Sequence, residues 1–388
     1  MNVKKFFLAL TCIFSCMALA PAEAAWQPQL SVGLLSGQEA ITLRLPQKSQ
    51  IFQEGSDKPL MTLEAGSQLS VTHDGQTFLV NARKLTSSGV GIIIKAAGAK
   101  NQGYYFTQGQ HEYRGAAKII LRHGKLSLIN VVDTEDYLKG VIPEEMPFDW
   151  PAEALKAQAV AARTYALKNR KRHEGEGYDL CTSTHCQLYL GRKAEKATAS
   201  KALEATAGEV LTYQGALIEA LFHTDSGGMT ENSEEVWGTK LPYLRGAEEK
   251  EKYTKPWKNT FNAERVASLA KKQSHKDIGS LKKIELSKLT IGRGDKDRTS
   301  SGRVKQVVFI GSMGKAVVSG NDLRNLLGLR STLFNLQLSH NQVTVEGYGW
   351  GHGLGLSQWG AKSWAENNKS YRDILKHYYQ HTVLKKLY

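Results

Sequence analysis

The feature that constrains this chain most is a short turn bracketed by prolines, followed directly by an alanine-rich segment. Pro143 and Pro147 enclose Glu144, Glu145 and Met146. Proline fixes its own φ and pushes the preceding residue out of the helical region. The two carboxylates are therefore expected to lie on stiffened backbone.

A helix is predicted directly after this turn. Pro151 suits its first turn, and Glu153 suits the positive end of its dipole. Most positions from 154 to 166 are Ala, Val or Leu, so the helix is apolar most of the way round. We expect a helix across residues 152–168 to be largely buried in the core.

Polar side chains interrupt this apolar surface at Gln158, Arg163 and Tyr165. A buried amide or guanidinium is costly unless it is hydrogen-bonded, so Gln158 and Arg163 are both expected to have partners. These residues either brace the neighbouring loop or contact a substrate beside the carboxylate pair. The sequence leaves both interpretations open.

The segment before the turn has a β pattern. From residue 30 to about 132, short alternating or continuously apolar runs are separated by Gly and Asp-Gly turns. The predicted fold class is α+β, with a β-rich N-terminal region (25–109) and a mixed α+β catalytic core (110–388). Within that core, residues 247–300 are predicted to form a solvated, lysine-rich lobe.

The N-terminus resembles a secretory signal over residues 1–24. Lys4 and Lys5 form a positive end, residues 6–20 an apolar run, and residues 22–24 a small-residue cleavage site. We expect export to the periplasm or the cell wall. A membrane contact is expected only if this segment stays uncleaved as an anchor.

The charge balance favours an anionic partner. The chain has 51 Lys and Arg against 37 Asp and Glu, a net charge of +14, and such a balance attracts polyanions. The basic residues are dispersed, without the basic helix or aromatic–basic repeat typical of nucleic-acid binding. For an exported chain we expect anionic cell-wall polymers and no nucleic acid.

Cysteine and histidine cluster after the helix. Cys181, His185 and Cys186 lie within six residues, and His173 precedes them. These ligand types suit zinc. A disulfide between Cys181 and Cys186 is the alternative, because their short spacing can close a tight loop in an oxidising compartment.

A glycine run marks the C-terminal part of the chain. Glycine recurs at every second position from 347 to 355, around His352 and ahead of Gln358. Extended chain of this kind has one face without side chains, so its backbone can approach a ligand or another strand closely. Tight strand packing is the alternative to ligand binding.

The central stretch resembles the stage II sporulation protein D family, which is related to amidase enhancers. The resemblance lies in Gly-Val-x-Pro-x-Glu-Met-Pro at residues 140–147 and in Ala-Leu-Lys-Ala-Gln-Ala-Val-Ala-Ala-Arg-Thr-Tyr at residues 154–165. It implies a lytic transglycosylase that acts on peptidoglycan glycan strands, or a relative that binds them and stimulates a cell-wall amidase. The family's catalytic glutamate corresponds to Glu145.

The resemblance also implies the rest of the site. It favours zinc over the disulfide and places the glycine run, the segment 235–238 and a Ser-Gly-Gly-x-Thr motif at residues 226–230 in the substrate cleft. The candidate substrate contacts are Gln158, Arg163, Tyr165, Ser226, Gly227, Gly228, His352 and Gln358. The candidate zinc ligands are His173, Cys181, His185 and Cys186.

The implied chemistry needs one carboxyl group. It protonates the glycosidic oxygen and then removes the proton from the C6 hydroxyl of N-acetylmuramic acid, which closes a 1,6-anhydro ring. An apolar environment raises a glutamate pKa enough to supply that proton. Glycan hydrolases use two carboxylates, and Glu144, Glu135 or Asp136 could supply the second. A hydrolase therefore stays an alternative, as does a non-catalytic amidase enhancer.

Overall fold

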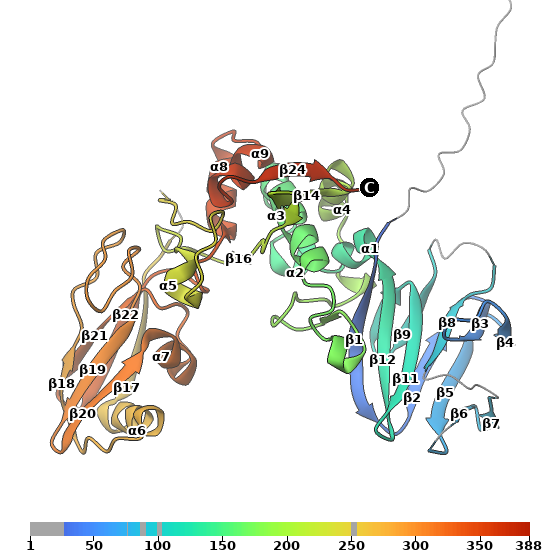
Figure 1. Cartoon of the computed structure of the whole chain (residues 1–388), viewed down its shortest axis with the longest axis horizontal. Coiled ribbons are helices and arrows are strands. Elements are labelled where there is room, and N and C mark those ends of the chain that lie inside the picture. Colours follow the sequence, from blue (N-terminus) through green and yellow to red (C-terminus); the bar gives the residue numbers. More distant parts are fainter. Residues whose placement is uncertain (1–26, 76, 86–90, 99–102, 250–253) are drawn as a thin grey trace, which may run out of the picture.

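The structure, a computed structural model, describes residues 27–75, 77–85, 91–98, 103–249 and 254–388. The predicted signal over residues 1–24 lies outside these ranges. The chain forms an arch, with a β-rich region on one side, a second lobe on the other and helices between them (Figure 1). In the ranges described, no helix is long and apolar enough to span a bilayer.

Two sheets build the β-rich region. The strand orders are β13-β1-β12-β11-β8-β3-β4 in the seven-stranded sheet and β10-β9-β2-β5-β6-β7 in the six-stranded sheet. The first sheet contains β13 (Leu180–Cys181), β1 (Gln29–Gln38), β12 (Lys125–Asp133), β11 (Ala116–Arg122), β8 (Gly91–Ala96), β3 (Ser49–Gln53) and β4 (Pro59–Leu63). The second contains β10 (His111–Arg114), β9 (Tyr105–Gln108), β2 (Ile41–Leu45), β5 (Ser67–His73), β6 (Phe78–Val80) and β7 (Arg83–Lys84).

The predicted alternation explains which face of each strand is buried. In β2, Ile41, Leu43 and Leu45 are buried, whereas Thr42 and Arg44 are exposed. Successive side chains on a strand point to opposite faces, so an apolar residue at every second position covers one face. These inward side chains join a single large hydrophobic core that continues into the helices.

The predicted boundary between residues 109 and 110 is wrong. It falls inside the β9–β10 hairpin, in which His111 pairs with Gln108. The N-terminal strand β1 also pairs antiparallel with β12, from Gln29 opposite Asp133 onward. The strands before and after residue 109 share sheets and one core, because a half-buried strand needs its neighbour for its backbone hydrogen bonds.

The alanine-rich helix forms as predicted. Helix α3 spans Ala152–Lys168 and is buried from Ala154 to Leu167 except at Lys156. The short helices α1 (Thr134–Lys139) and α2 (Ile142–Glu145) precede it. Its neighbours in space are α4 (Ala197–Ala205), α8 (Gln358–Glu366), α9 (Tyr371–Tyr378) and β14 (Glu209–Tyr213).

One charged group on α3 is fully buried, and it has a carboxylate partner. Arg163 donates to both oxygens of Glu135 on α1, at 2.7 and 2.8 Å, and to the backbone oxygen of Glu209 at 3.1 Å. Burial acts to raise the pKa of Glu135, but the hydrogen bonds and charge of Arg163 hold it below its usual value. The pair therefore contributes stability at neutral pH that is lost as the pH falls through this lowered pKa.

The second lobe has its own hydrophobic core, from Trp257 to Val345. The predicted lysine-rich lobe over 247–300 is therefore only part of a larger unit, because its strands pair with later ones. One of its sheets has the strand order β17 (Trp257–Asn262), β22 (Gln342–Gly347), β21 (Phe334–Ser339). The other has the order β18 (Leu281–Glu285), β19 (Gln306–Gly311), β20 (Gly314–Ser319). The lobe also contains the helices α6 (Ala263–Ser274) and α7 (Gly320–Leu327).

Helix α7 ends at a glycine. Gly328 has φ of 64°, in the left-handed region that terminates helices.

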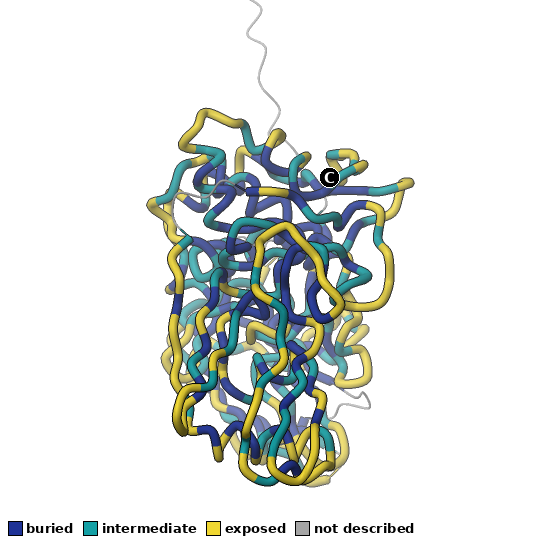
Figure 2. The backbone as a smooth tube through the Cα atoms, turned by 90° about the vertical axis from the view of Figure 1, so that its left-hand side faces the viewer, coloured by how far each residue is buried: buried dark blue, intermediate teal, exposed yellow. Residues whose placement is uncertain are grey.

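Seen from the side of the second lobe, exposed positions gather in loops at its lower end, whereas buried backbone is concentrated inside (Figure 2).

Breaking the buried ion pair should destabilise the fold strongly. Arg163→Ala or Glu135→Ala leaves an uncompensated charge in the core, which typically costs about 3–5 kcal/mol. Lys171→Ala removes one partner of the exposed Lys171–Glu174 pair and should cost less than about 1 kcal/mol. Urea unfolding measures all three variants, and similar losses in all of them would contradict the prediction.

Candidate active site and metal cluster

A cavity of about 490 Å³ lies between the helical region and the second lobe. Its walls come from the end of α2, from α3, from the loops around residues 184–186 and 219–224, from α5 (Ser233–Trp237), from α7 and from the glycine run. The lining residues are Glu145, Tyr165, Arg172, Thr184, His185, Cys186, Glu219, Leu221, Phe222, His223, Thr224, Trp237, Arg324, Trp350, Gly351, His352 and Gln358.

Glu145 is the last residue of α2, and its carboxyl group faces this cavity. Its Oε1 accepts a hydrogen bond from the backbone N–H of Leu188 at 2.9 Å. Burial raises the pKa of Glu145; the bond from Leu188 acts against this shift, and Glu144 adds to it. Ile142 and Met146 beside it are fully buried. The carboxyl group of Glu145 therefore keeps its proton at pH values above the usual glutamate pKa.

The other carboxylates predicted to assist are engaged elsewhere or lie outside the cavity lining. Glu135 is held by Arg163, and Asp136 accepts a hydrogen bond from Lys139 Nζ at 2.8 Å. Glu144 does not belong to the lining residues. The second carboxylate in the cavity is instead Glu219, whose Oε2 accepts from Asn169 at 3.3 Å.

Sequence reasoning missed Glu219, although a signal was present. It is the single charged residue in the apolar segment 216–222. An apolar run of this length is typical of one strand, but only β15 (Ala216–Leu217) and β16 (Phe222–His223) form at its ends. Residues 218–221 between them belong to neither strand, and Glu219 lines the cavity from this segment.

Three predicted contact residues lie in the cavity lining: Tyr165, His352 and Gln358. The hydroxyl of Tyr165 accepts from Arg172 at 3.1 Å, and burial raises its pKa to about 12. His352 Nδ1 accepts from the backbone N–H of Leu354 at 2.9 Å. Burial, with the nearby charges of Arg303 and Arg324, lowers the pKa of His352 to about 4. Its imidazole is therefore neutral at pH 7.

Gln158 and Arg163 do not reach the cavity, which corrects their assignment as substrate contacts. Both are fully buried, and Arg163 is occupied by Glu135. The predicted pairing of Gln158 is also wrong, because neither atom of its amide has a partner among the described residues. One turn away on α3, Ala154 and Ala162 offer no polar side chain.

The Ser226-Gly227-Gly228 motif shapes the wall behind the cavity and is not part of its lining. Ser226 Oγ donates to Glu249 at 2.6 Å, and Ser226 is fully buried. Gly227 has φ of 78°, and a Cβ there would lie 3.0 Å from the backbone nitrogen of Gly349. These residues therefore fix the loop against the glycine run and are not placed to contact a ligand directly.

The glycine run packs tightly and also borders the cavity. Gly349 and Gly351 have φ of 72° and 116°, and a Cβ on Gly351 would lie 2.7 Å from the Cβ of His223. Tight packing therefore explains these glycines. Between them the side chain of Trp350 reaches the cavity, as does His352 after them.

Two exposed tryptophans stand at the cavity wall. Trp237 on α5 is 49% exposed and Trp350 is 51% exposed. The guanidinium of Arg330 lies 5.0 Å from the ring centre of Trp350. Flat, partly desolvated indole faces can stack on the apolar face of a sugar ring, so these residues suit a carbohydrate ligand.

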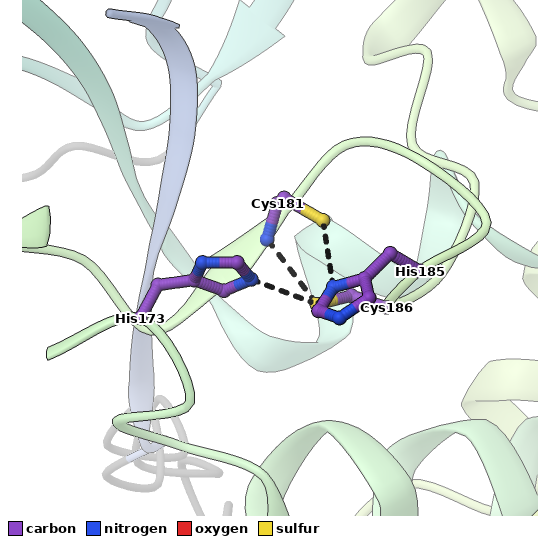
Figure 3. Close-up of side chains that lie close together, drawn as sticks. All are labelled: His173, Cys181, His185 and Cys186. Carbon is purple, nitrogen blue, oxygen red and sulfur yellow. Dashed lines mark hydrogen bonds between the residues drawn. The ribbon is translucent and has the colours of Figure 1, made fainter. Parts of the chain in front are cut away.

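The four predicted zinc ligands converge on one point (Figure 3). Their donor atoms all lie within 4.8 Å of one another. Cys186 Sγ is 3.5 Å from His173 Nε2 and 3.7 Å from His185 Nδ1, and Cys181 Sγ is 3.7 Å from His185 Nδ1. A tetrahedral zinc ion with bonds of about 2.0–2.3 Å separates its ligands by roughly 3.3–3.8 Å. The cluster could therefore hold zinc with little movement.

Glu176 and Tyr178 orient the ring of His173. His173 Nδ1 is 2.6 Å from Glu176 Oε1, and Tyr178 donates to Glu176 Oε2 at 2.6 Å. A carboxylate on one ring nitrogen directs the other toward a metal. Cys181 and Cys186 are free thiols in the structure, so no disulfide joins them.

Comparisons with known proteins give two matching segments, and each segment contributes residues to the cavity. A profile of the stage II sporulation protein family matches residues 122–213, which contain Glu145 and the cysteine–histidine cluster. A domain of unknown function (DUF8618) matches residues 220–355, which contain Trp237, Arg324, Trp350 and His352.

Similar proteins are about a third identical to this chain over the segments that match. An uncharacterized protein of Brachyspira hyodysenteriae is 31% identical over 75% of this chain and 78% of its own length. The stage II sporulation protein D of Bacillus amyloliquefaciens is 32% identical over 64% of this chain and 73% of its own length. The amidase enhancer of Bacillus subtilis is 33% identical over 64% of this chain, but the match covers only 40% of that longer protein.

We propose that the cluster binds one zinc ion per chain. Elemental analysis of protein purified without chelators should find that zinc, and His185→Gln or Cys186→Ser should lose it and lower the melting temperature. His111→Gln, which removes an exposed imidazole, should retain the metal. Metal-free protein with Cys181 and Cys186 oxidised together would decide for the disulfide.

Proposed function

This chain belongs to the stage II sporulation protein D and amidase enhancer family, and on that premise we propose that it is a peptidoglycan lytic transglycosylase of the cell wall. The position of Glu145 carries this proposal. A single carboxyl group with a raised pKa faces a cavity large enough for sugar residues. The export that such a role requires is predicted from residues 1–24.

The reaction uses Glu145 twice. Its Oε1 is occupied by the Leu188 amide, so Oε2 is available to carry the proton. That proton passes to the glycosidic oxygen between N-acetylmuramic acid and N-acetylglucosamine as the C1–O bond breaks. The carboxylate then takes the proton of the C6 hydroxyl while O6 bonds to C1. The products are a free 4-hydroxyl and a 1,6-anhydro ring, and no water is consumed.

The cluster would support this chemistry without taking part in it. Four protein ligands leave no open position on a zinc ion for water or substrate. His185 and Cys186 border the cavity, and two residues further on Leu188 holds Glu145 through its amide. The proposed metal is therefore structural, and its effect on catalysis is to fix the loop that positions the acid.

A two-carboxylate hydrolase is favoured by one observation, the presence of Glu219 in the same cavity. In that reaction Glu219 would activate water or attack C1 while Glu145 protonates the leaving group. The products then differ, since hydrolysis gives a reducing N-acetylmuramic acid end without the anhydro ring.

A non-catalytic role is favoured by the similarity to a protein named amidase enhancer. In that case the cavity would bind glycan strands and the chain would act through a cell-wall amidase. Purified protein would then bind glycan but release no product from it unless the amidase is added.

Glu145→Gln keeps the side-chain shape and removes the proton donor. Positioned acid–base catalysis is typically worth about 10²–10⁴-fold, so release of 1,6-anhydro products from purified glycan strands should fall by at least that factor. Mass spectrometry of the digest measures the products. Glu144→Gln and Glu219→Gln serve as matched controls.

Both controls should keep most of the activity and yield the same anhydro product. Full activity of the Glu145→Gln protein would refute the assignment of the acid. Loss of activity in Glu219→Gln, with reducing ends released by the wild-type protein, would instead establish the hydrolase.

The pH profile provides an independent check. The acid form of Glu145 starts the reaction, so kcat/KM should fall as the pH rises through its pKa. Because burial raises that pKa, this fall should occur above the ordinary glutamate value of about 4.3. A fall centred at or below that value would show that the site does not protect the protonated acid.

A further inference from the structure

An arginine of the second lobe faces the cavity without a partner. Arg324 lies on α7 and lines the cavity. Across the described residues, no acceptor forms a hydrogen bond or ion pair with its guanidinium, and burial lowers its pKa. A half-buried cation of this kind is unfavourable unless an anion comes to it.

A second arginine increases the positive potential behind this wall. Arg303 is fully buried and donates from Nη2 to the backbone oxygen of Ser226 at 2.6 Å. Its Nε and Nη1 have no partner among the described residues. A Cβ on Gly353 would lie 2.5 Å from Nε, so this guanidinium packs directly against the backbone that follows His352.

The acidic groups near Arg303 are engaged by other donors. Glu231 accepts from Ser301 Oγ at 2.6 Å, Glu249 from Ser226 Oγ at 2.6 Å, and Asp225 from Thr254 Oγ1 at 2.9 Å. None of them is recorded in an ion pair with either arginine in the described part of the chain. Their charges still stabilise the charged form of Arg303. Burial alone shifts the pKa of Arg324, so Arg324 is the arginine whose charge is left uncompensated.

His223 and His352 line the cavity near the two arginines, and both imidazole rings are neutral. Their rings lie 5.4 Å apart. Burial and the nearby arginines hold the pKa of His352 at about 4, and burial, His352 and Arg303 hold that of His223 well below its usual value. They can offer hydrogen bonds but no charge. Arg324 is thus the cation that a ligand at this end can reach.

We propose that Arg324, reinforced by Arg303, forms a subsite for a carboxylate carried by the muramic acid residue of the glycan. A guanidinium matches a carboxylate in charge and in its paired donors. This inference rests on the proposed function and gives a recognition role to the 220–355 domain, which supplies both arginines.

The chemistry of the glycan limits where that carboxylate can come from. N-acetylglucosamine has no acidic group. N-acetylmuramic acid has a lactyl group, whose carboxyl is free when no peptide is attached and amide-linked when one is. In the second case the peptide brings its own carboxylates. Both sources share one chemistry, and three matched ligands separate them.

The test measures binding to the inactive Glu145→Gln protein, so it does not depend on catalysis. The ligands are a GlcNAc–MurNAc tetrasaccharide with free lactyl carboxylates, its lactyl methylamide, and the same glycan carrying L-Ala-D-Glu. The free acid should bind roughly ten- to a hundredfold more tightly than the methylamide, as a charged hydrogen bond typically provides. Adding Arg324→Gln should abolish that preference.

Two further variants keep the result interpretable. Lys305→Gln removes one exposed positive charge from the same lobe and should keep the preference. Arg324→Lys should keep part of it, and the melting temperatures of all variants should match that of the parent.

If the dipeptide glycan binds like the free acid, the peptide supplies the carboxylate; if it binds like the methylamide, the lactyl group does.

Equal affinity for acid and methylamide, an unchanged preference in Arg324→Gln, or no glycan binding would each overturn the subsite. A failure of the proposed reaction looks different. In that case the wild-type protein releases no anhydro product, yet the Arg324-dependent preference for the carboxylate persists.

Discussion

The burial of helix α3 is the constraint on which the rest of the structure depends. Its alanines leave little side-chain volume, so α4, α8, α9 and β14 can all approach it closely. A helix buried on every side cannot leave a charge unpaired, and Arg163 finds Glu135 on α1. Because α1 leads directly into the proline-bracketed turn, the same ion pair also fixes the start of the short helix that ends at Glu145.

Glu145 is then held from two directions. The turn fixes its backbone, and the amide of Leu188 fixes one carboxyl oxygen. Leu188 lies just after the cysteine–histidine cluster, so the conformation of that loop determines the position of the acid. The proposed zinc ion would tie this loop down at the cluster, since open loop backbone is otherwise the least stable part of a fold.

The second lobe completes the cavity with a different set of groups. The helical side contributes the buried acid, whereas the lobe contributes exposed indole rings and Arg324. The two histidines between them are kept neutral by burial and by the arginines. One side therefore suits proton transfer and the other suits recognition of a sugar and its anionic substituent.

Features that are local along the chain could be predicted from the sequence alone. The alternation of β2, the buried helix across 152–168, the turn that carries Glu145 and the cluster of His173, Cys181, His185 and Cys186 all depend on neighbouring residues and on the period of the apolar pattern. Only the tertiary structure decided that β1 joins β12, that Gln158 has no partner among the residues described, and that Glu219 and Arg324 face Glu145's cavity. Those outcomes depend on which surfaces meet when distant segments pack, and no periodicity within a single segment records that.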